Sequence, residues 1–122
     1  MLIRHITITK YKNIIMFESL KKLLGIEPKV SLIDLVNEGA VILDVRTKGE
    51  FTQGHIRGSI NIPVENLSSN LNKFKGKSKP IITCCASGSR SAYAKGILTS
   101  NGFTNVHNGG AWISLKRKIS IN

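Results

Sequence analysis

The apolar positions of the chain fall into three short runs separated by polar segments. Residues 40–45 form a run broken only by Asp44, residues 59–62 form a second that stops at Pro63, and residues 80–84 form a third. Short runs that are apolar at successive positions are typical of strands buried on both faces. The pattern therefore predicts a sheet with at least three short, buried strands.

Helical spacing appears twice before the first run. Residues 31–39 begin with Ser31, a good N-cap, carry apolar side chains at helical intervals and end at Gly39. Residues 16–25 show the same spacing and also end at a glycine, which predicts a short leading helix. Residues 1–15 alternate only loosely and indicate an extra strand or an arm. Helical stretches are also expected between the three apolar runs. This alternation of helices with short apolar strands predicts a parallel α/β sheet, with ligand sites at the carboxyl ends of its strands.

The composition and charge of the chain indicate which class of protein it is and which kind of partner it would attract. A chain of 122 residues with 41% hydrophobic and 20% charged residues is typical of one ordinary globular domain. The net charge is +11, and all seven acidic residues lie in the first 65 positions. The basic residues after them are Lys73, Lys75, Lys77, Lys79, Arg90, Lys95, Lys116, Arg117 and Lys118. The part of the chain from residue 66 onward, its basic half, would attract an anionic partner or substrate, or it is simply a solubilising surface.

The two cysteines, Cys84 and Cys85, are adjacent, and no paired C-x-x-C spacing accompanies them. They indicate a reactive thiol in a reducing compartment rather than a disulfide framework or a metal site. Residues 1–17 lack an apolar run of signal-peptide length, and Met16 is a second candidate for the natural start. We therefore expect a cytoplasmic protein.

Residues 81–91 carry the chemistry, because a buried strand there runs into a loop of small residues and then a helix. Backbone N–H groups of such a loop converge on one point, and the helix N-terminus adds positive potential, so a thiolate at Cys85 would be stabilised. Gly88 would give the loop its backbone freedom, and Arg90 would direct a guanidinium at an anion. Taken singly, these residues also fit an inert core cysteine, a turn and a solvated arginine. Their joint C-x-x-G-x-R spacing favours an anion-binding nucleophile site.

Strand geometry chooses between the two cysteines. Successive side chains on a strand point to opposite faces, so Cys84 and Cys85 cannot both project into the loop. Cys85 begins the C-x-x-G-x-R spacing. We therefore expect Cys84 to lie among apolar neighbours with a raised pKa.

Three separated motifs lie within about residues 30 to 115. The first contains Leu43-Asp44-Val45-Arg46, Glu50-Phe51, Gly54-His55-Ile56, Gly58-Ser59 and Asn61-Ile62-Pro63. The second is Cys-Ala-Ser-Gly-Ser-Arg-Ser at residues 85–91, and the third contains Gly102-Phe103-Thr104-Asn105-Val106 and Asn108-Gly109-Gly110-Ala111-Trp112. In order and spacing they resemble the first signature, the active-site loop, and the closing strand and turn of the rhodanese-like domain family.

This resemblance implies an α/β fold of the rhodanese-like type, with a parallel sheet of about five strands flanked by helices on both faces. It places the domain at residues 30–118, after an arm and leading helix at residues 1–29. The resemblance implies that Cys85 is the catalytic residue. It also implies that the loop binds the substrate through Ala86, Ser87, Gly88, Ser89 and Arg90.

The implied function is a thiosulfate sulfurtransferase that works through a Cys85 persulfide and needs no metal or organic cofactor. A small anionic donor such as thiosulfate would supply the sulfur. Cyanide or a thiol, including a carrier-protein thiol, would accept it, and neither nucleic acid nor a membrane is expected as a partner.

Residues outside the loop receive mainly structural roles from the resemblance. Asp44, Arg46 and Glu50 are expected to hold the strand end and the adjoining turn, since a buried charge needs a partner. His55 is expected to be a hydrogen-bonded structural residue rather than a catalytic one, and Trp112 a core anchor.

Two other functions stay open at this stage. The first is a phosphatase or arsenate reductase of the related cell-cycle phosphatase type, which also combines a cysteine with an arginine. In those relatives the loop is one residue longer than the six residues from Cys85 to Arg90, and six residues resemble the loop length associated with sulfur transfer. A non-catalytic binding module on the same fold usually lacks the loop cysteine, which is present here.

Overall fold

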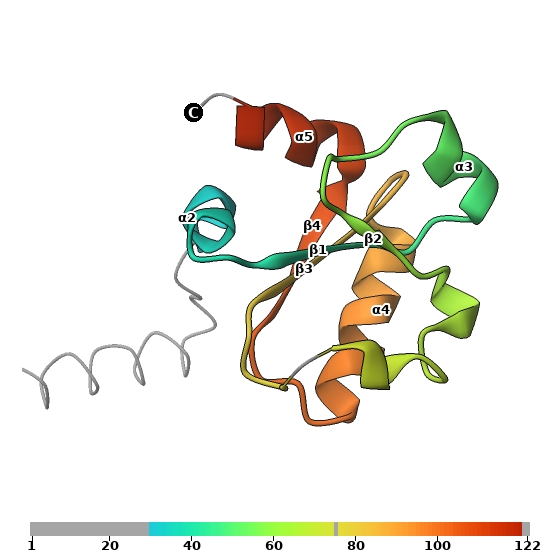
Figure 1. Ribbon diagram of the computed structural model, residues 1–122, viewed down its shortest axis with the longest axis vertical. Coiled ribbons are helices and arrows are strands. Elements are labelled where there is room, and N and C mark those ends of the chain that lie inside the picture. Colours follow the sequence, from blue (N-terminus) through green and yellow to red (C-terminus); the bar gives the residue numbers. More distant parts are fainter. Residues whose placement is uncertain (1–29, 75, 121–122) are drawn as a thin grey trace, which may run out of the picture. The chain divides into compact units, whose positions relative to one another are not determined.

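The computed structural model of the protein describes residues 30–74 and 76–120, in which four parallel strands form one sheet (Figure 1). The strands are β1 (Val41–Asp44), β2 (Ile60–Asn61), β3 (Ile81–Cys85) and β4 (Val106–Ala111), and their order across the sheet is β2-β1-β3-β4. The three apolar runs form β1, β2 and β3, and the closing strand of the third motif forms β4. The parallel sheet is confirmed with four strands in this part of the chain rather than about five, because the higher number came from the resemblance and not from a fifth run. The arm and the leading helix predicted for residues 1–29 lie outside the described residues.

Helices cover both faces of the sheet, as expected. On one face lies α4 (Ser89–Ser100), and on the other lie α2 (Leu32–Asn37) and α5 (Trp112–Ser120) (Figure 1). The helix predicted after Ser31 is confirmed, since the Ser31 hydroxyl accepts a hydrogen bond from the Asp34 N–H at 3.4 Å. A further helix, α3 (Lys48–Gln53), follows β1. None of the helices in the described part of the chain has the length and apolar character needed to cross a membrane.

The connection from β2 to β3 contains only two short 3-10 turns, η1 (Val64–Asn66) and η2 (Leu71–Lys73), where helical alternation predicted a helix. Pro63 comes directly before η1. Apolar side chains keep helical spacing here and pack on the layer of the core that contains α4, but the residues between them are mainly Asn and Ser. The side chains of Ser69 and Asn70 bind the Asn66 carbonyl, and such local hydrogen bonds favour turns over a continuous helix.

Alternation along β3 divides the core into two layers. Ile81 and Cys85 belong to the layer under α4, whereas Ile82 and Cys84 belong to the layer under α2 and α5. All four side chains are almost fully buried. The two adjacent cysteines therefore point to opposite faces of the sheet, as strand geometry predicted.

A bulge in β4 brings this strand close to the loop that follows β3. Thr83 pairs with Asn108, but Cys85 pairs with Ala111, so β4 contains one extra residue in this stretch. Gly109 fills a space in which a Cβ atom would lie 2.7 Å from Ile82 Cγ2 and 2.9 Å from Thr83 O. Only glycine fits at this point of the sheet.

Candidate active site

The candidate nucleophile lies where β3 ends, at the carboxyl edge of the sheet. A short loop, Ala86 to Gly88, joins Cys85 to α4, and Gly88 is the N-cap of that helix. Gly88 has a φ of +108°, which a residue with a side chain rarely adopts, and a Cβ atom there would lie 3.4 Å from Gly110 Cα. Gly88 thus supplies the turn for which the sequence singled it out.

The Cys85 sulfur is surrounded by hydrogen-bond donors. The Gly88 N–H donates to Cys85 Sγ at 3.0 Å, and the Ser91 N–H donates to it at 3.4 Å. Burial of the sulfur acts to raise the pKa of Cys85. The Ser91 hydroxyl and the N–H groups of Ser91, Gly88 and Ser87 outweigh that effect and lower the pKa below the ordinary value of a thiol. The loop therefore favours a thiolate at this position.

Cys84 has the opposite environment. It is fully buried in the layer under α2 and α5, and burial, followed by the nearby charge of Asp44, raises the pKa of Cys84 to about 12. A thiol with this pKa stays protonated near neutral pH and is a poor nucleophile. Both features agree with the sequence prediction.

The remaining loop residues differ in exposure. Ala86, Ser87 and Ser89 are exposed, and Gly88 is half-buried. Cys85 itself has no exposed surface.

Arg90 lies in the first turn of α4, but its guanidinium is engaged. Nη1 and Nη2 of Arg90 bind the two carboxylate oxygens of Glu50 at 2.7 and 3.0 Å. The sequence predicted an arginine that points at an anion and a glutamate that only holds the turn. The structure instead joins the two in one ion pair, about one third of each side chain being exposed.

Ser91 and Asn108 are polar contacts of the site that the sequence reading did not assign to it. Ser91 is fully buried, and its Oγ lies 3.5 Å from Cys85 Sγ and 2.6 Å from Asn108 Oδ1. Ser91 follows the C-x-x-G-x-R spacing directly, which is the one signal that could have pointed to it. Asn108 belongs to the closing motif, but nothing in that motif indicates a contact with Ser91. Its pairing with Thr83, whose hydroxyl binds the Ser91 carbonyl, places it there.

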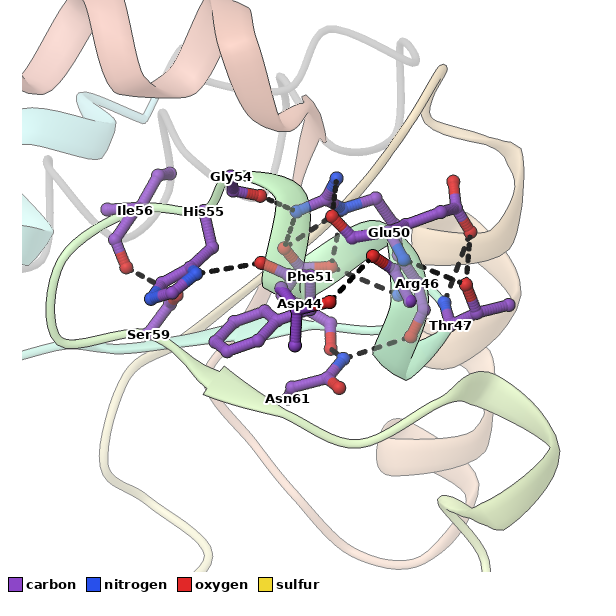
Figure 2. Close-up of polar contacts among 12 residues, drawn as sticks. Asp44, Arg46, Thr47, Glu50, Phe51, Gly54, His55, Ile56, Ser59 and Asn61 are labelled. Atoms are coloured by element: carbon purple, nitrogen blue, oxygen red, sulfur yellow. Dashed lines mark hydrogen bonds and ion pairs between the residues drawn. The ribbon is translucent and has the colours of Figure 1, made fainter.

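A buried ion pair supports the end of β1 next to this loop. Arg46 Nη2 binds Asp44 Oδ2 at 2.7 Å and also donates to Gly54 O at 2.7 Å, and its guanidinium lies 4.4 Å from the centre of the Trp112 ring. Figure 2 shows Arg46 between the Asp44 carboxylate and the Gly54 carbonyl. Several hydrogen bonds thus compensate the burial of these charges. This arrangement agrees with the structural role expected for Asp44 and Arg46.

Glu50 has a second role besides its ion pair. Its carboxylate accepts hydrogen bonds from the N–H and hydroxyl of Thr47, both at 3.1 Å, and the Thr47 hydroxyl in turn caps the Glu50 N–H (Figure 2). This capping box fixes the start of α3. Glu50 therefore joins the turn after β1 to the loop arginine.

The two other residues considered from the sequence lie in structural positions. The His55 ring stacks on Phe51 with 3.8 Å between the ring centres, and His55 Nδ1 lies 2.8 Å from Phe51 O (Figure 2). Trp112 is half-buried at the start of α5 and packs against the layer under α2 and α5. Among residues 30–74 and 76–120, no group of three or more His, Cys, Asp or Glu side chains could hold a metal ion.

Comparison with known proteins gives consistent matches. The sequence profile described as "Rhodanese-like domain" matches residues 28–110. A relative from Arabidopsis thaliana named "Thiosulfate sulfurtransferase 16, chloroplastic" is 42% identical over 84 residues, which is 60% of this chain and 70% of the relative.

Two solved structures share the fold. The human "Single Domain Sulfurtranferase TSTD1" has a TM-score of 0.62 and 29% identity, and the match covers 75% of this chain and 96% of the human one. A "rhodanese with anions from E. coli" has a TM-score of 0.58 and 31% identity over 61% of this chain and 88% of the other. The strand, loop and helix around Cys85, together with these matches, establish that the chain belongs to the rhodanese-like domain family, several of whose members are named as sulfurtransferases.

Proposed function

We propose that this protein is a thiosulfate sulfurtransferase that carries sulfane sulfur on Cys85. The observation that carries the proposal is the polar environment of Cys85 Sγ. The Gly88 N–H and the Ser91 N–H donate to it at 3.0 and 3.4 Å, and the Ser91 hydroxyl oxygen lies 3.5 Å away. These donors lower the pKa of Cys85 despite its burial. A thiolate held in this way is the species needed for attack on sulfur.

The reaction has two halves. In the first, the Cys85 thiolate attacks the outer sulfur of thiosulfate, the sulfur–sulfur bond of the donor breaks, and sulfite leaves with the bonding electron pair. Cys85 now carries a persulfide whose outer sulfur is negatively charged. In the second, cyanide or a thiolate attacks that outer sulfur, the new persulfide bond breaks, and its electron pair returns to Cys85 as a thiolate. No electron or proton has to come from a metal or organic cofactor.

The loop residues would bind the donor and the persulfide. Backbone N–H groups of Ala86, Ser87, Gly88 and Ser89 are the candidates for holding the negative outer sulfur, since a loop at a helix N-terminus attracts anions. Arg90 adds positive charge next to the loop while Glu50 holds it in place. The donor must reach a sulfur without exposed surface, so we expect the exposed loop residues to adjust when it binds.

The basic half of the chain fits anionic partners of this reaction. Among the described residues from Asn66 onward every charged side chain is basic, which would speed the encounter with thiosulfate or with an acidic carrier protein that presents a thiol. A domain at residues 30–118 and a cytoplasmic location remain part of this proposal.

A two-substrate assay tests the function directly. The purified chain is supplied with thiosulfate and cyanide, and in parallel with a generic phosphate ester, because a phosphatase also uses a cysteine and an arginine. We expect thiocyanate to form and the ester to remain intact. Hydrolysis of the ester without thiocyanate formation would replace sulfur transfer by the phosphatase alternative. Activity on neither substrate would favour the binding module.

A further inference from the structure

The Ser91 hydroxyl lies between two groups that compete for it. Its Oγ is 2.6 Å from Asn108 Oδ1 and 3.5 Å from Cys85 Sγ, and the Ser91 side chain has no exposed surface. The Gly88 carbonyl, at 3.0 Å, is a third acceptor within reach. A hydroxyl has only one proton to donate, so it cannot satisfy all of these acceptors at once.

The orientation of the Asn108 amide is fixed by two backbone groups. Asn108 Oδ1 accepts from the Gly110 N–H at 2.9 Å, and Asn108 Nδ2 donates to the Gly88 carbonyl at 3.2 Å. Exchanging the amide oxygen and nitrogen would set donor against donor and acceptor against acceptor. The atom that faces Ser91 is therefore the oxygen, and it can only accept.

The direction of the hydrogen bonds must then follow the charge of Cys85. A neutral Cys85 thiol donates its S–H to Ser91 Oγ, and the Ser91 hydroxyl donates to Asn108 Oδ1. A Cys85 thiolate has no proton to give and is a strong acceptor, so the hydroxyl turns toward the sulfur.

We propose that the Ser91 hydroxyl switches its hydrogen bond between Asn108 Oδ1 and Cys85 Sγ as the charge on that sulfur changes, which makes Asn108 a positioning residue that acts through Ser91. The proposal rests on the sulfur transfer described above. When Cys85 Sγ becomes a neutral persulfide sulfur, the hydroxyl turns to Asn108. When the persulfide bond breaks and Cys85 leaves as a thiolate, the hydroxyl turns back. The proton stays on Ser91 throughout, so no proton acceptor is needed.

Charged and titratable groups on the surrounding elements are separate from this pair. They are Cys84 on β3, Asp44 at the end of β1 with Arg46 after it, Glu50 on α3, Arg90 on α4, and His107 on β4, whose ring contacts Asn105. Cys84 stays protonated and neutral, Arg90 acts on Cys85 by charge alone, and substitution of Ser91 or Asn108 leaves each of them in place. A change in Cys85 ionisation after such a substitution can therefore be assigned to the hydroxyl and its acceptors.

The switch makes opposite predictions for its two members. Removing the Ser91 hydroxyl removes a donor to the thiolate and disfavours ionisation. Removing the Asn108 oxygen removes the acceptor that competes with the thiolate and favours ionisation. A merely structural role for Asn108 would loosen the loop and disfavour ionisation instead.

The test is a titration of Cys85 by its rate of alkylation. Iodoacetamide is added to the full chain at a series of pH values, and modification of Cys85 is followed by mass in the parent, Ser91→Ala, Asn108→Ala and double variants. We expect the midpoint to rise by about one pH unit in Ser91→Ala, a tenfold loss of thiolate, and to fall in Asn108→Ala. The double variant should match Ser91→Ala, because Asn108 acts only through the hydroxyl. A higher midpoint in Asn108→Ala, or the same shift with and without Ser91, would overturn the switch.

A second variant covers the case in which Asn108→Ala does not fold. Asn108→Asp keeps the acceptor for Gly110 N–H and holds the hydroxyl proton more strongly, so the midpoint should rise further when the Ser91 hydroxyl is present than in the Ser91→Ala background. An equal rise of the midpoint in both backgrounds would mean that the added carboxylate acts on Cys85 only through its charge, and it would refute the switch. The titration uses no sulfur donor. These shifts without thiocyanate formation would therefore refute the reaction, whereas thiocyanate formation without the shifts would refute only the switch.

Discussion

The Arg90 guanidinium makes a bidentate ion pair with the Glu50 carboxylate, at 2.7 Å from Nη1 to Oε1 and 3.0 Å from Nη2 to Oε2. The pair joins the first turn of α4 to α3, 40 residues earlier in the chain. An arginine has five N–H donors, so this ion pair leaves others for an anion. Glu50 therefore holds the guanidinium beside the loop and reduces the number of orientations it can adopt.

Loss of this guanidinium should impair the use of anionic donors more than it impairs folding. We expect Arg90→Ala to cost about 1.5–3 kcal/mol of transition-state stabilisation with thiosulfate, roughly a 10- to 150-fold loss in kcat/KM at low salt. Glu50→Gln should cause a smaller loss, because the arginine stays but its orientation is no longer held by a charge. Lys95→Ala is the matched control, since it removes an exposed charge from the same helix. Arg90→Ala kinetics equal to those of the control would remove Arg90 from the site.

The same ion pair should make stability depend on acid. Hydrogen bonding to Arg90, supported by Thr47, lowers the pKa of Glu50 from 4.5 to about 2. The unfolded chain thus takes up a proton at a higher pH than the folded one. The stability that the pair contributes is complete above about pH 4.5 and is lost as the pH falls from there toward 2.

Urea unfolding at several pH values measures this effect. The difference in unfolding free energy between the parent and Glu50→Gln should be constant from neutral pH to about pH 5 and should shrink between about pH 4.5 and 2. Because both side chains are about one third exposed, the difference should also shrink in high salt. A gap that is independent of pH over this window would contradict a stabilising role for the charge of Glu50.

The two cysteines should differ completely in activity. We expect Cys85→Ser to abolish thiosulfate-dependent turnover and Cys84→Ser to preserve most of it, because only Cys85 faces the loop donors. After incubation with thiosulfate, intact-mass analysis should find one extra sulfur atom on the parent and on Cys84→Ser. Cys85→Ser should carry none. A persulfide on Cys85→Ser that cyanide removes would transfer the nucleophile role to Cys84.

The β4 bulge should tolerate no side chain at Gly109. A Cβ atom there would lie 2.7 Å from Ile82 Cγ2, 2.9 Å from Thr83 O and 3.0 Å from Leu115 Cδ2, so we expect Gly109→Ala to destabilise the fold by about 1–3 kcal/mol or more. Gly96→Ala is the control. Gly96 lies on the exposed face of α4 with open space around it, and its replacement should stabilise the protein by up to about 1 kcal/mol. Equal unfolding midpoints for both variants in urea would contradict this packing.

Local patterns in the sequence predicted the strands and the position of the nucleophile. The apolar runs became β1, β2 and β3, and alternation alone placed Cys84 and Cys85 on opposite faces. Such features depend on neighbouring residues, so a short stretch of sequence is enough to predict them. The helix predicted between β2 and β3 did not form, because the Asn and Ser side chains of that segment bind its backbone and favour turns.

Contacts between distant residues could not be predicted in this way. The pairing of Arg90 with Glu50 depends on where α3 docks, and the contact of Ser91 with Asn108 depends on the pairing of β4 with β3. Nothing in the local pattern around Glu50 or Asn108 distinguishes a partner of the loop from an ordinary surface residue.

The separation of the two thiols by the sheet also determines how the protein would respond to oxidation. Neighbouring Cα atoms are only about 3.8 Å apart, less than an unstrained disulfide spans, and these two side chains point in opposite directions. The chain contains no third cysteine. A sulfenic acid formed on Cys85 would therefore find no internal thiol to condense with, and its repair would depend on a thiol from another molecule.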